Sequence, residues 1–171
     1  MHGATEAVHD KITQASGSFT QTLTGIKRLL KMGKHIEIRV VVSKLNINEF
    51  YSIAELIVQE LNQIEYVSII ALEMTGCARK NKDMVWIPYK ESFEHISEGI
   101  MYMIKHGINV KLYNFPLCTV DKKFWTITEK SISPYKVRFS QECEKCKMQN
   151  ACGGVFSGTI SIEKEELKAI I

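Results

Sequence analysis

The stretch from Ser18 to Ser43, SFTQTLTGIKRLLKMGKHIEIRVVVS, decides the fold class of this chain. Its first part predicts a helix over residues 18–32, because five apolar residues recur at helical spacing: Phe19, Leu23, Ile26, Leu29 and Leu30. Ser18 is the expected N-cap and Gly33 the expected end of this helix. The β-branched run over residues 36–43 then predicts a strand. A helix that leads directly into a strand is the repeating unit of an α/β fold.

The same unit occurs twice more along the chain. The apolar pattern predicts two further helices and two further strands, at 48–62 and 91–106 and at 66–73 and 108–113. Three such units joined by short turns predict a parallel sheet. Residues 1–10 have no regular apolar period and 74–89 are polar, so we expect a loop in each place.

Three parallel strands cannot close a barrel, so residues 1–115 are expected to form a partial (half) β/α barrel. The helices cover only one face of such a sheet, and the other face, which carries Arg39 and Val41, is too apolar to lie comfortably in water. One strand is also left as an apolar edge. We therefore expect either an amino-terminal partner half that completes the barrel or self-association of the chain.

Residues 116–171 are expected to form a small cysteine-rich extension around the stretch CEKCKMQNACGG, residues 143–154. Its three thiols have the spacing C-x2-C-x5-C, and Cys118 is the obvious fourth. Thiols clustered in this way favour a metal centre, with reactive or structural thiols as the alternative. A strand near 155–162 and a charged helical tail at 164–171 are expected to end the chain.

The ligand type alone does not identify the metal, because thiolates bind both zinc and iron–sulfur clusters. Structural zinc sites usually pair two C-x2-C knuckles, whereas a single distant cysteine replaces one knuckle here. This asymmetry slightly favours an iron–sulfur cluster and leaves zinc as the alternative. Cys77 is left over from the set, and we expect a small packed residue there rather than a catalytic thiol.

Arg39 and Ser43 alternate with the apolar positions of their strand, so both are expected on the face opposite the helices. Ser43 lies at the carboxyl end of the strand, where β/α barrels bind their ligands. The Arg39 guanidinium could anchor a ligand carboxylate or form a structural ion pair with Glu37 or Glu73. Both alternatives stay open at this point.

The composition limits the function classes. The chain has 171 residues, 45% of them hydrophobic, and a formal net charge of +3. Its lysines form no basic stripe with interleaved aromatic residues, so we expect no nucleic-acid partner. No stretch has the length of a membrane span and the first residues lack a signal-peptide pattern, so we expect no membrane partner. Five clustered cysteines indicate a reducing compartment, with the cytoplasm as the expected location.

The order of several motifs resembles the second half of a radical S-adenosylmethionine (SAM) enzyme barrel. They are Gly3-x5-His9-Asp10, Gly17-Ser18-Phe19-x3-Leu23-x-Gly25-Ile26, Arg39-Val-Val-Val with Asn46, and Met74-Thr-Gly76-x-Ala78-x2-Asn81. Pro116-Leu117-Cys118 and the run from Cys143 to Gly154 resemble the auxiliary-cluster extension of its peptide-modifying members. The chain is similar to the C-type radical SAM maturases of His-Xaa-Ser repeat peptide systems. Two motifs of these maturases have counterparts in this chain, at Glu73–Asn81 and Ser131–Lys136. The resemblance extends over essentially the whole chain.

This resemblance implies an auxiliary 4Fe–4S cluster and part of a SAM pocket. The cluster ligands would be Cys118, Cys143, Cys146 and Cys152, and the pocket would include Arg39, Ser43, Leu72 and Met74. In an intact enzyme, the family abstracts a hydrogen atom from a side chain of a peptide or protein substrate.

One departure from the family pattern is large. The C-x3-C-x2-C motif that holds the SAM-cleaving cluster is absent. We therefore expect a fragment, a split-gene product or a remnant that does not generate the radical alone, so enzyme status stays open. The alternative is a non-catalytic module, stabilised by zinc or an iron–sulfur cluster, that binds a peptide or protein.

Overall fold

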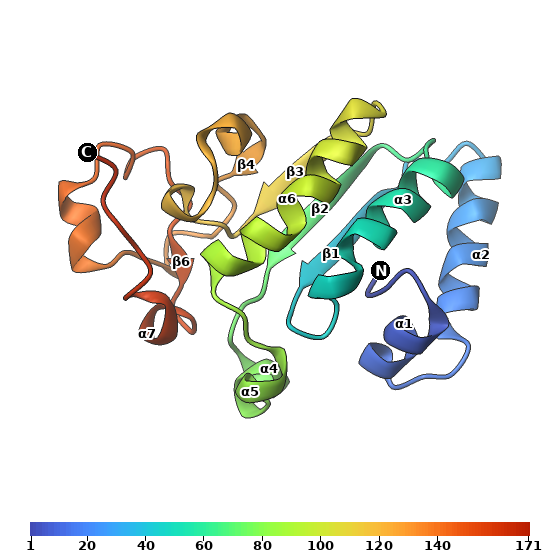
Figure 1. Cartoon of the computed structure of the whole chain (residues 1–171), viewed down its shortest axis with the longest axis horizontal. Helices are drawn as coiled ribbons and strands as arrows, with labels where there is room; N and C mark the ends of the chain where they lie inside the picture. Colours follow the sequence, from blue (N-terminus) through green and yellow to red (C-terminus); the bar gives the residue numbers. More distant parts are fainter.

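The computed structural model describes residues 1–171. A four-stranded parallel sheet with the strand order β1-β2-β3-β4 lies at its centre. Helices α3 and α6 cover one face of this sheet (Figure 1). The strands are β1 (Glu37–Val42), β2 (Tyr66–Ala71), β3 (Val110–Tyr113) and β4 (Thr128–Glu129). The predicted α/β class with a parallel sheet is thus confirmed.

The three main helices lie where they were predicted: α2 (Ser18–Lys31), α3 (Phe50–Glu60) and α6 (Tyr89–Lys105). The apolar positions of α2 were expected to form a buried face, but none of its residues is buried and Leu29 is exposed. Gly33 and Gly107 follow α2 and α6 with φ angles of 67° and 79°. Glycine adopts this left-handed conformation at little cost, which lets the chain leave each helix and enter the next strand.

The other elements are short. The remaining helices are α1 (Glu6–Thr13), α4 (Gly76–Lys80), α5 (Lys82–Val85) and α7 (Ile160–Glu163). Four 3₁₀ turns are η1 (Ile47–Glu49), η2 (Leu117–Thr119), η3 (Lys122–Ile127) and η4 (Gln141–Lys145). A separate antiparallel pair joins β5 (Val137–Arg138) to β6 (Val155–Phe156).

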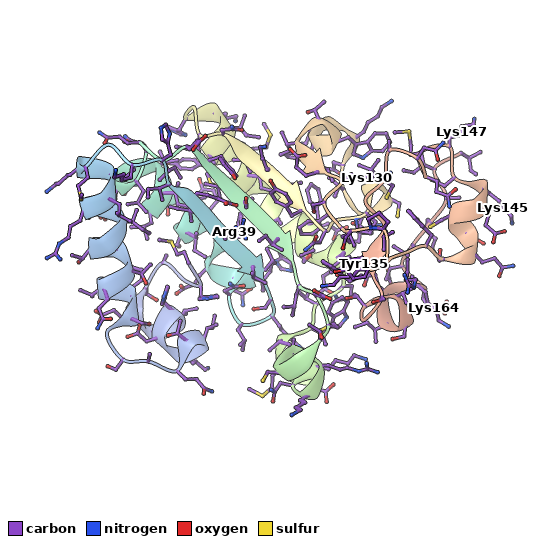
Figure 2. All side chains as sticks on the ribbon, turned by 180° about the vertical axis from the view of Figure 1, so that it is seen from behind. Arg39, Lys130, Tyr135, Lys145, Lys147 and Lys164 are labelled. Carbon is purple, nitrogen blue, oxygen red and sulfur yellow. The ribbon has the colours of Figure 1, made fainter.

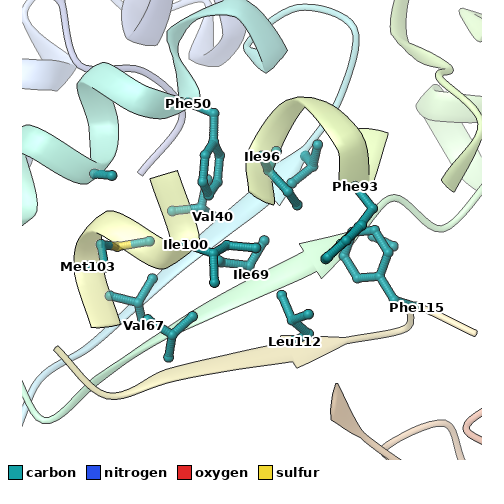
Figure 3. Packing of buried hydrophobic residues seen from close by; sticks show 14 of the residues in the cluster. Val40, Phe50, Val67, Ile69, Phe93, Ile96, Ile100, Met103, Leu112 and Phe115 are labelled. Atoms are coloured by element: carbon teal, nitrogen blue, oxygen red, sulfur yellow. The ribbon is translucent and has the colours of Figure 1, made fainter. Parts of the chain in front are cut away.

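One hydrophobic core lies between the sheet and the helices. Side chains of α6, including Ile96, Ile100 and Met103, pack over Ile69 and Leu112 of the sheet (Figure 3). Burial of each such side chain stabilises the fold by about 1.5–3 kcal/mol. The same cluster continues into the last third of the chain through Phe124, Val155 and Leu167. The carboxyl-terminal region is therefore packed on the sheet rather than tethered to it.

The register brings the carboxyl ends of the strands to one edge of the sheet. Val42 lies opposite Ala71, and Ile70 lies opposite Tyr113. The segments that follow β1, β2 and β3 consequently start at the same edge. In open parallel sheets this is the edge where ligands bind.

The expected loop at residues 1–10 is wrong, because α1 begins there. The Asp10 carboxylate accepts hydrogen bonds from the Gly17 and Phe19 amides, at 2.5 and 2.8 Å, and from the Ser18 hydroxyl at 2.8 Å. Gly17, rather than Ser18, is the N-cap of α2. These contacts hold α1 against the start of α2, which a search for apolar periodicity does not detect.

Two other expectations are also corrected. Residues 74–89 contain α4 and α5 rather than a plain loop. The strand expected near 155–162 is limited to β6 and gives way to α7, and residues 164–171 form no helix. Beyond the prediction, β4 pairs with β3, so the sheet continues past the expected boundary between residues 115 and 116.

The sheet is open, since β1 pairs only with β2 and β4 only with β3. Viewed from behind, its uncovered face carries Arg39 (Figure 2). Alternate residues of β1 are buried under the helices, and those between them, Glu37, Arg39 and Val41, are half-buried or exposed. None of the helices has both the length and the apolar character needed to cross a membrane.

Candidate metal centre

The four cysteines of the predicted set line a single pocket. Cys118 comes from η2, which follows β3. Cys143 lies within η4, and Cys146 and Cys152 lie in the turns between η4 and β6. Apolar side chains such as Leu117, Leu167 and Ile170 form much of the remaining wall. Thiols distant in the sequence are thus brought to one largely apolar site.

Hydrogen bonds to the backbone fix the position of Cys118. The Trp125 indole N–H donates to the carbonyl oxygens of Leu117 and Val120, at 3.1 and 3.0 Å. The carbonyl oxygen of Pro116 accepts from the Thr119 hydroxyl at 2.8 Å. Because its flanking residues are held on both sides, Cys118 presents its thiol from a rigid turn.

The C-x2-C pair also forms a turn. The Cys146 amide donates to the Cys143 carbonyl oxygen at 3.1 Å, and the Cys152 amide donates to that of Met148 at 2.9 Å. These turns place Cys143, Cys146 and Cys152 in the wall of the pocket that Cys118 also lines.

Backbone amides also donate to the sulfur atoms. The Leu117 and Gly154 amides each lie 3.4 Å from Cys152 Sγ, and the Ile170 amide lies 3.4 Å from Cys146 Sγ. Such N–H···S bonds stabilise negative charge on sulfur and tune metal centres held by thiolates.

Burial makes these thiols hard to ionise in the absence of a cation. It raises the pKa of the Cys118 thiol to about 11, and the nearby Cys152 and Cys143 add to the effect. Burial likewise raises the pKa of the Cys152 thiol. A bound metal ion reverses this preference, because coordination deprotonates a thiol.

The arrangement does not match the ligand sphere of a single ion. No three histidine, cysteine, aspartate or glutamate side chains lie close enough together to hold one. Four thiolates at about 2.3 Å from one zinc ion would lie only about 3.8 Å from one another. The four cysteines share one pocket without forming such a group.

The Arg39 side chain pairs with a carboxylate of its own strand. Its Nε and Nη2 donate to the two carboxylate oxygens of Glu37 at 2.8 and 3.1 Å, and the Ser68 hydroxyl donates to Glu37 as well. The Arg39 guanidinium lowers the pKa of the Glu37 carboxyl. The structural ion pair with Glu37 is therefore formed, and a role for Arg39 in ligand binding remains a prediction.

The other residues of the predicted SAM pocket follow β1 and β2 and have partners within the chain. The Ser43 amide and hydroxyl both donate to the side-chain oxygen of Asn46, at 2.9 and 3.3 Å. Leu72 and Met74 are bonded through their backbones to Tyr89 and Thr159. Cys77 is exposed, so the expectation of a packed residue there is wrong.

Sequence reasoning missed a buried polar group beside Met74, formed by Thr159, Glu163 and Tyr89. The Thr159 side-chain oxygen accepts the Met74 amide at 3.1 Å, and a Glu163 carboxylate oxygen accepts the Tyr89 amide at 3.0 Å. Burial raises the pKa of the Glu163 carboxyl to about 7 and raises that of the Tyr89 hydroxyl. These residues lie far apart in the sequence and form no motif.

Gly154 allows a close approach of chain segments beside the cysteines. Its φ is +65°, and an added Cβ would lie 2.6 Å from Val137 Cγ2 and 2.9 Å from the Arg138 carbonyl oxygen. We expect Gly154→Ala to lower the free energy of unfolding by about 2–3 kcal/mol, through backbone strain and steric overlap. Urea denaturation measures the change.

Gly25→Ala in α2 is the matched control for this substitution. Nothing lies within 4 Å of a Cβ added there, and alanine is favoured over glycine in a helix by about 1 kcal/mol. Equal stabilities of the two variants would show that the close approach at Gly154 is unimportant.

Comparison with family models, curated proteins and solved structures finds no match to this chain.

Proposed function

We propose that this chain is part of a peptide-modifying maturase of radical SAM lineage and carries its auxiliary 4Fe–4S cluster. The cluster ligands would be Cys118, Cys143, Cys146 and Cys152. One observation carries the proposal: these four cysteines, from two distant segments, line one largely apolar pocket beside the carboxyl end of β3. The lineage itself rests on the resemblance of the sequence motifs.

Hydrogen bonds to the sulfur atoms support a cluster over a single zinc ion. Amides of Leu117, Gly154 and Ile170 donate to two of the sulfur atoms, as is common around iron–sulfur clusters. Zinc in a non-catalytic peptide- or protein-binding module remains the alternative.

The rest of the chain would serve the same site. With a cysteine on each of its four irons, such a cluster would have no open position for substrate, and the chemistry it would supply when bound is electron transfer. The open parallel sheet would be the second half of a radical SAM barrel, with Arg39, Ser43, Leu72 and Met74 contributing part of the SAM pocket. A peptide or protein substrate would bind at this edge of the sheet, and radical generation would need the family's missing cluster motif.

Anaerobic purification with iron, sulfide and zinc analysis tests the proposal. We expect a brown protein with about four iron and four sulfide per chain. One zinc ion and no sulfide per chain would instead establish the metal-stabilised module. A chain that binds neither metal would contradict both functions.

The open sheet face predicts self-association when no partner half is present. Val41 of β1 lies on this face and is only half-buried. β1 is an edge strand of the sheet, and this edge is covered only in part, by bonds from the Met1 amino group to the Arg39 carbonyl oxygen and from the Asn46 side chain to the Val41 carbonyl oxygen. We expect sedimentation velocity at tens of micromolar to detect dimers or larger species. Val41→Lys should weaken this association.

Thr24→Lys adds the same charge to the exposed surface of α2, away from the sheet, and should leave association unchanged. A monomer of 19.5 kDa with sharp cooperative melting would show that the sheet is self-sufficient.

A further inference from the structure

Residues 153–170, here called the strap, leave the four-cysteine pocket and return to it. At its start, the Gly154 amide donates to Cys152 Sγ at 3.4 Å. At its end, the Ile170 amide donates to Cys146 Sγ at 3.4 Å, and the Ile170 carbonyl oxygen accepts the Lys147 amide at 2.9 Å. Both ends of the strap are therefore fixed on the cysteines.

The middle of the strap contacts the segment that follows β2. The Thr159 side-chain oxygen accepts the buried Met74 amide at 3.1 Å. The backbone of Gly158 comes so close that an added Cβ would lie 2.7 Å from the Met74 carbonyl oxygen. No side chain other than hydrogen fits there, so the contact depends on direct apposition of the two backbones.

Glu163 provides a second connection to the same segment. It is 0% exposed, and one carboxylate oxygen accepts the Tyr89 amide at 3.0 Å while the other has no partner. The Tyr89 hydroxyl in turn donates to the Leu72 carbonyl oxygen at 2.9 Å. The strap thus reaches the carboxyl end of β2 both directly and through the start of α6.

We propose that Thr159 and Glu163 are positioning residues that couple occupancy of the four-cysteine centre to the conformation of the segment Leu72–Met74. This inference rests on the proposed metal centre. A bound metal centre fixes the cysteines and hence both ends of the strap. With its ends fixed, the strap holds Thr159 and Glu163 in register with Met74 and Tyr89.

The coupling acts on the place where a ligand would bind. Backbone groups just beyond the carboxyl ends of parallel strands form the usual ligand crevice. Here the Met74 amide is hydrogen-bonded to Thr159 of the strap, and the Leu72 carbonyl oxygen is hydrogen-bonded to the Tyr89 hydroxyl. Ordering this segment before a ligand arrives would lower the entropic cost of binding, so a loaded centre would favour binding at this edge of the sheet.

Hydrogen–deuterium exchange of the full chain tests this coupling without any activity measurement. The chain reconstituted anaerobically with ferrous iron and sulfide is compared with the chelated, metal-free chain. We expect exchange in peptides covering residues 72–76 to be roughly tenfold slower after loading. Amides of β2 at residues 67–70, which are bonded within the sheet, should change little.

Thr159→Val removes the acceptor for the Met74 amide with little change in shape. We expect loading to slow exchange at 72–76 less than about twofold in this variant, with iron content and protection at 143–152 preserved. Thr128→Val is the matched control, because its hydroxyl donates instead to the Phe124 carbonyl oxygen. This control should keep the tenfold effect.

The outcomes separate the two proposals. Iron uptake without any change at 72–76 would overturn the coupling and leave the metal centre standing. A tenfold effect retained in Thr159→Val would overturn the role of Thr159. Failure of the chain to bind iron or zinc would overturn the metal centre and the coupling with it. The wild-type comparison decides the coupling even where a variant does not fold.

Discussion

Cys146→Ala is expected to lower metal affinity more than about 100-fold and to destabilise the carboxyl-terminal region. Even a residue that only supports a metal ligand contributes 10–100-fold to affinity, roughly, so removal of a ligand has a larger effect. Metal binding free energy is also folding free energy in small metal sites. We therefore expect a loss of about 3 kcal/mol or more in the free energy of unfolding.

Cys77→Ala is the matched control for that experiment. Cys77 is the one cysteine outside the pocket, and it is exposed at the start of α4. Its replacement should change stability by less than about 0.5 kcal/mol and leave the metal content unchanged. Metal analysis and thermal melting of both variants, purified anaerobically, provide the measurement. Similar metal contents in the two variants would show that Cys146 is not a ligand.

The long elements were predictable because each carries its own local signal. The helix face of α6 repeats every three or four residues, and β1 alternates buried and half-exposed positions. The C-x2-C spacing likewise fixes a turn in which two sulfur atoms share one side. Such features depend on neighbours in the sequence and need no knowledge of the rest of the fold.

The missed features depend on contacts between distant residues. α1 is held by the Asp10 carboxylate at the start of α2, and β4 is only two residues long. Thr159 and Met74 are 85 residues apart, and Glu163 and Tyr89 are 74 apart. No periodicity or motif in the sequence predicts these pairs. The contacts of the strap and the burial of the Glu163 carboxyl group are therefore visible only in the folded structure.

Glu163→Gln is expected to remove most of a pH dependence of stability that this buried carboxyl group creates. Glu163 is fully buried with one unpartnered oxygen, so burial raises its pKa from 4.5 to about 7, and nearby Glu166 adds to the shift. Between these two pH values the folded chain binds more protons than the unfolded chain. The wild-type chain should therefore lose stability as the pH rises from about 4.5 to 7, by up to about 3 kcal/mol.

Urea denaturation between about pH 5 and 8 measures this dependence. Glutamine keeps the shape of the side chain and cannot ionise, so the variant should show a flatter profile of stability against pH. Its buried amide leaves an unpaired group that costs about 1–3 kcal/mol, so the slope with pH, rather than the stability at one pH, is diagnostic. Glu165→Gln, whose side chain is 83% exposed in the same turn, should retain the wild-type slope. A Glu163→Gln profile as steep as that of the wild type would mean that Glu163 is ionised when folded, and that the contact between the strap and α6 is more hydrated than its burial indicates.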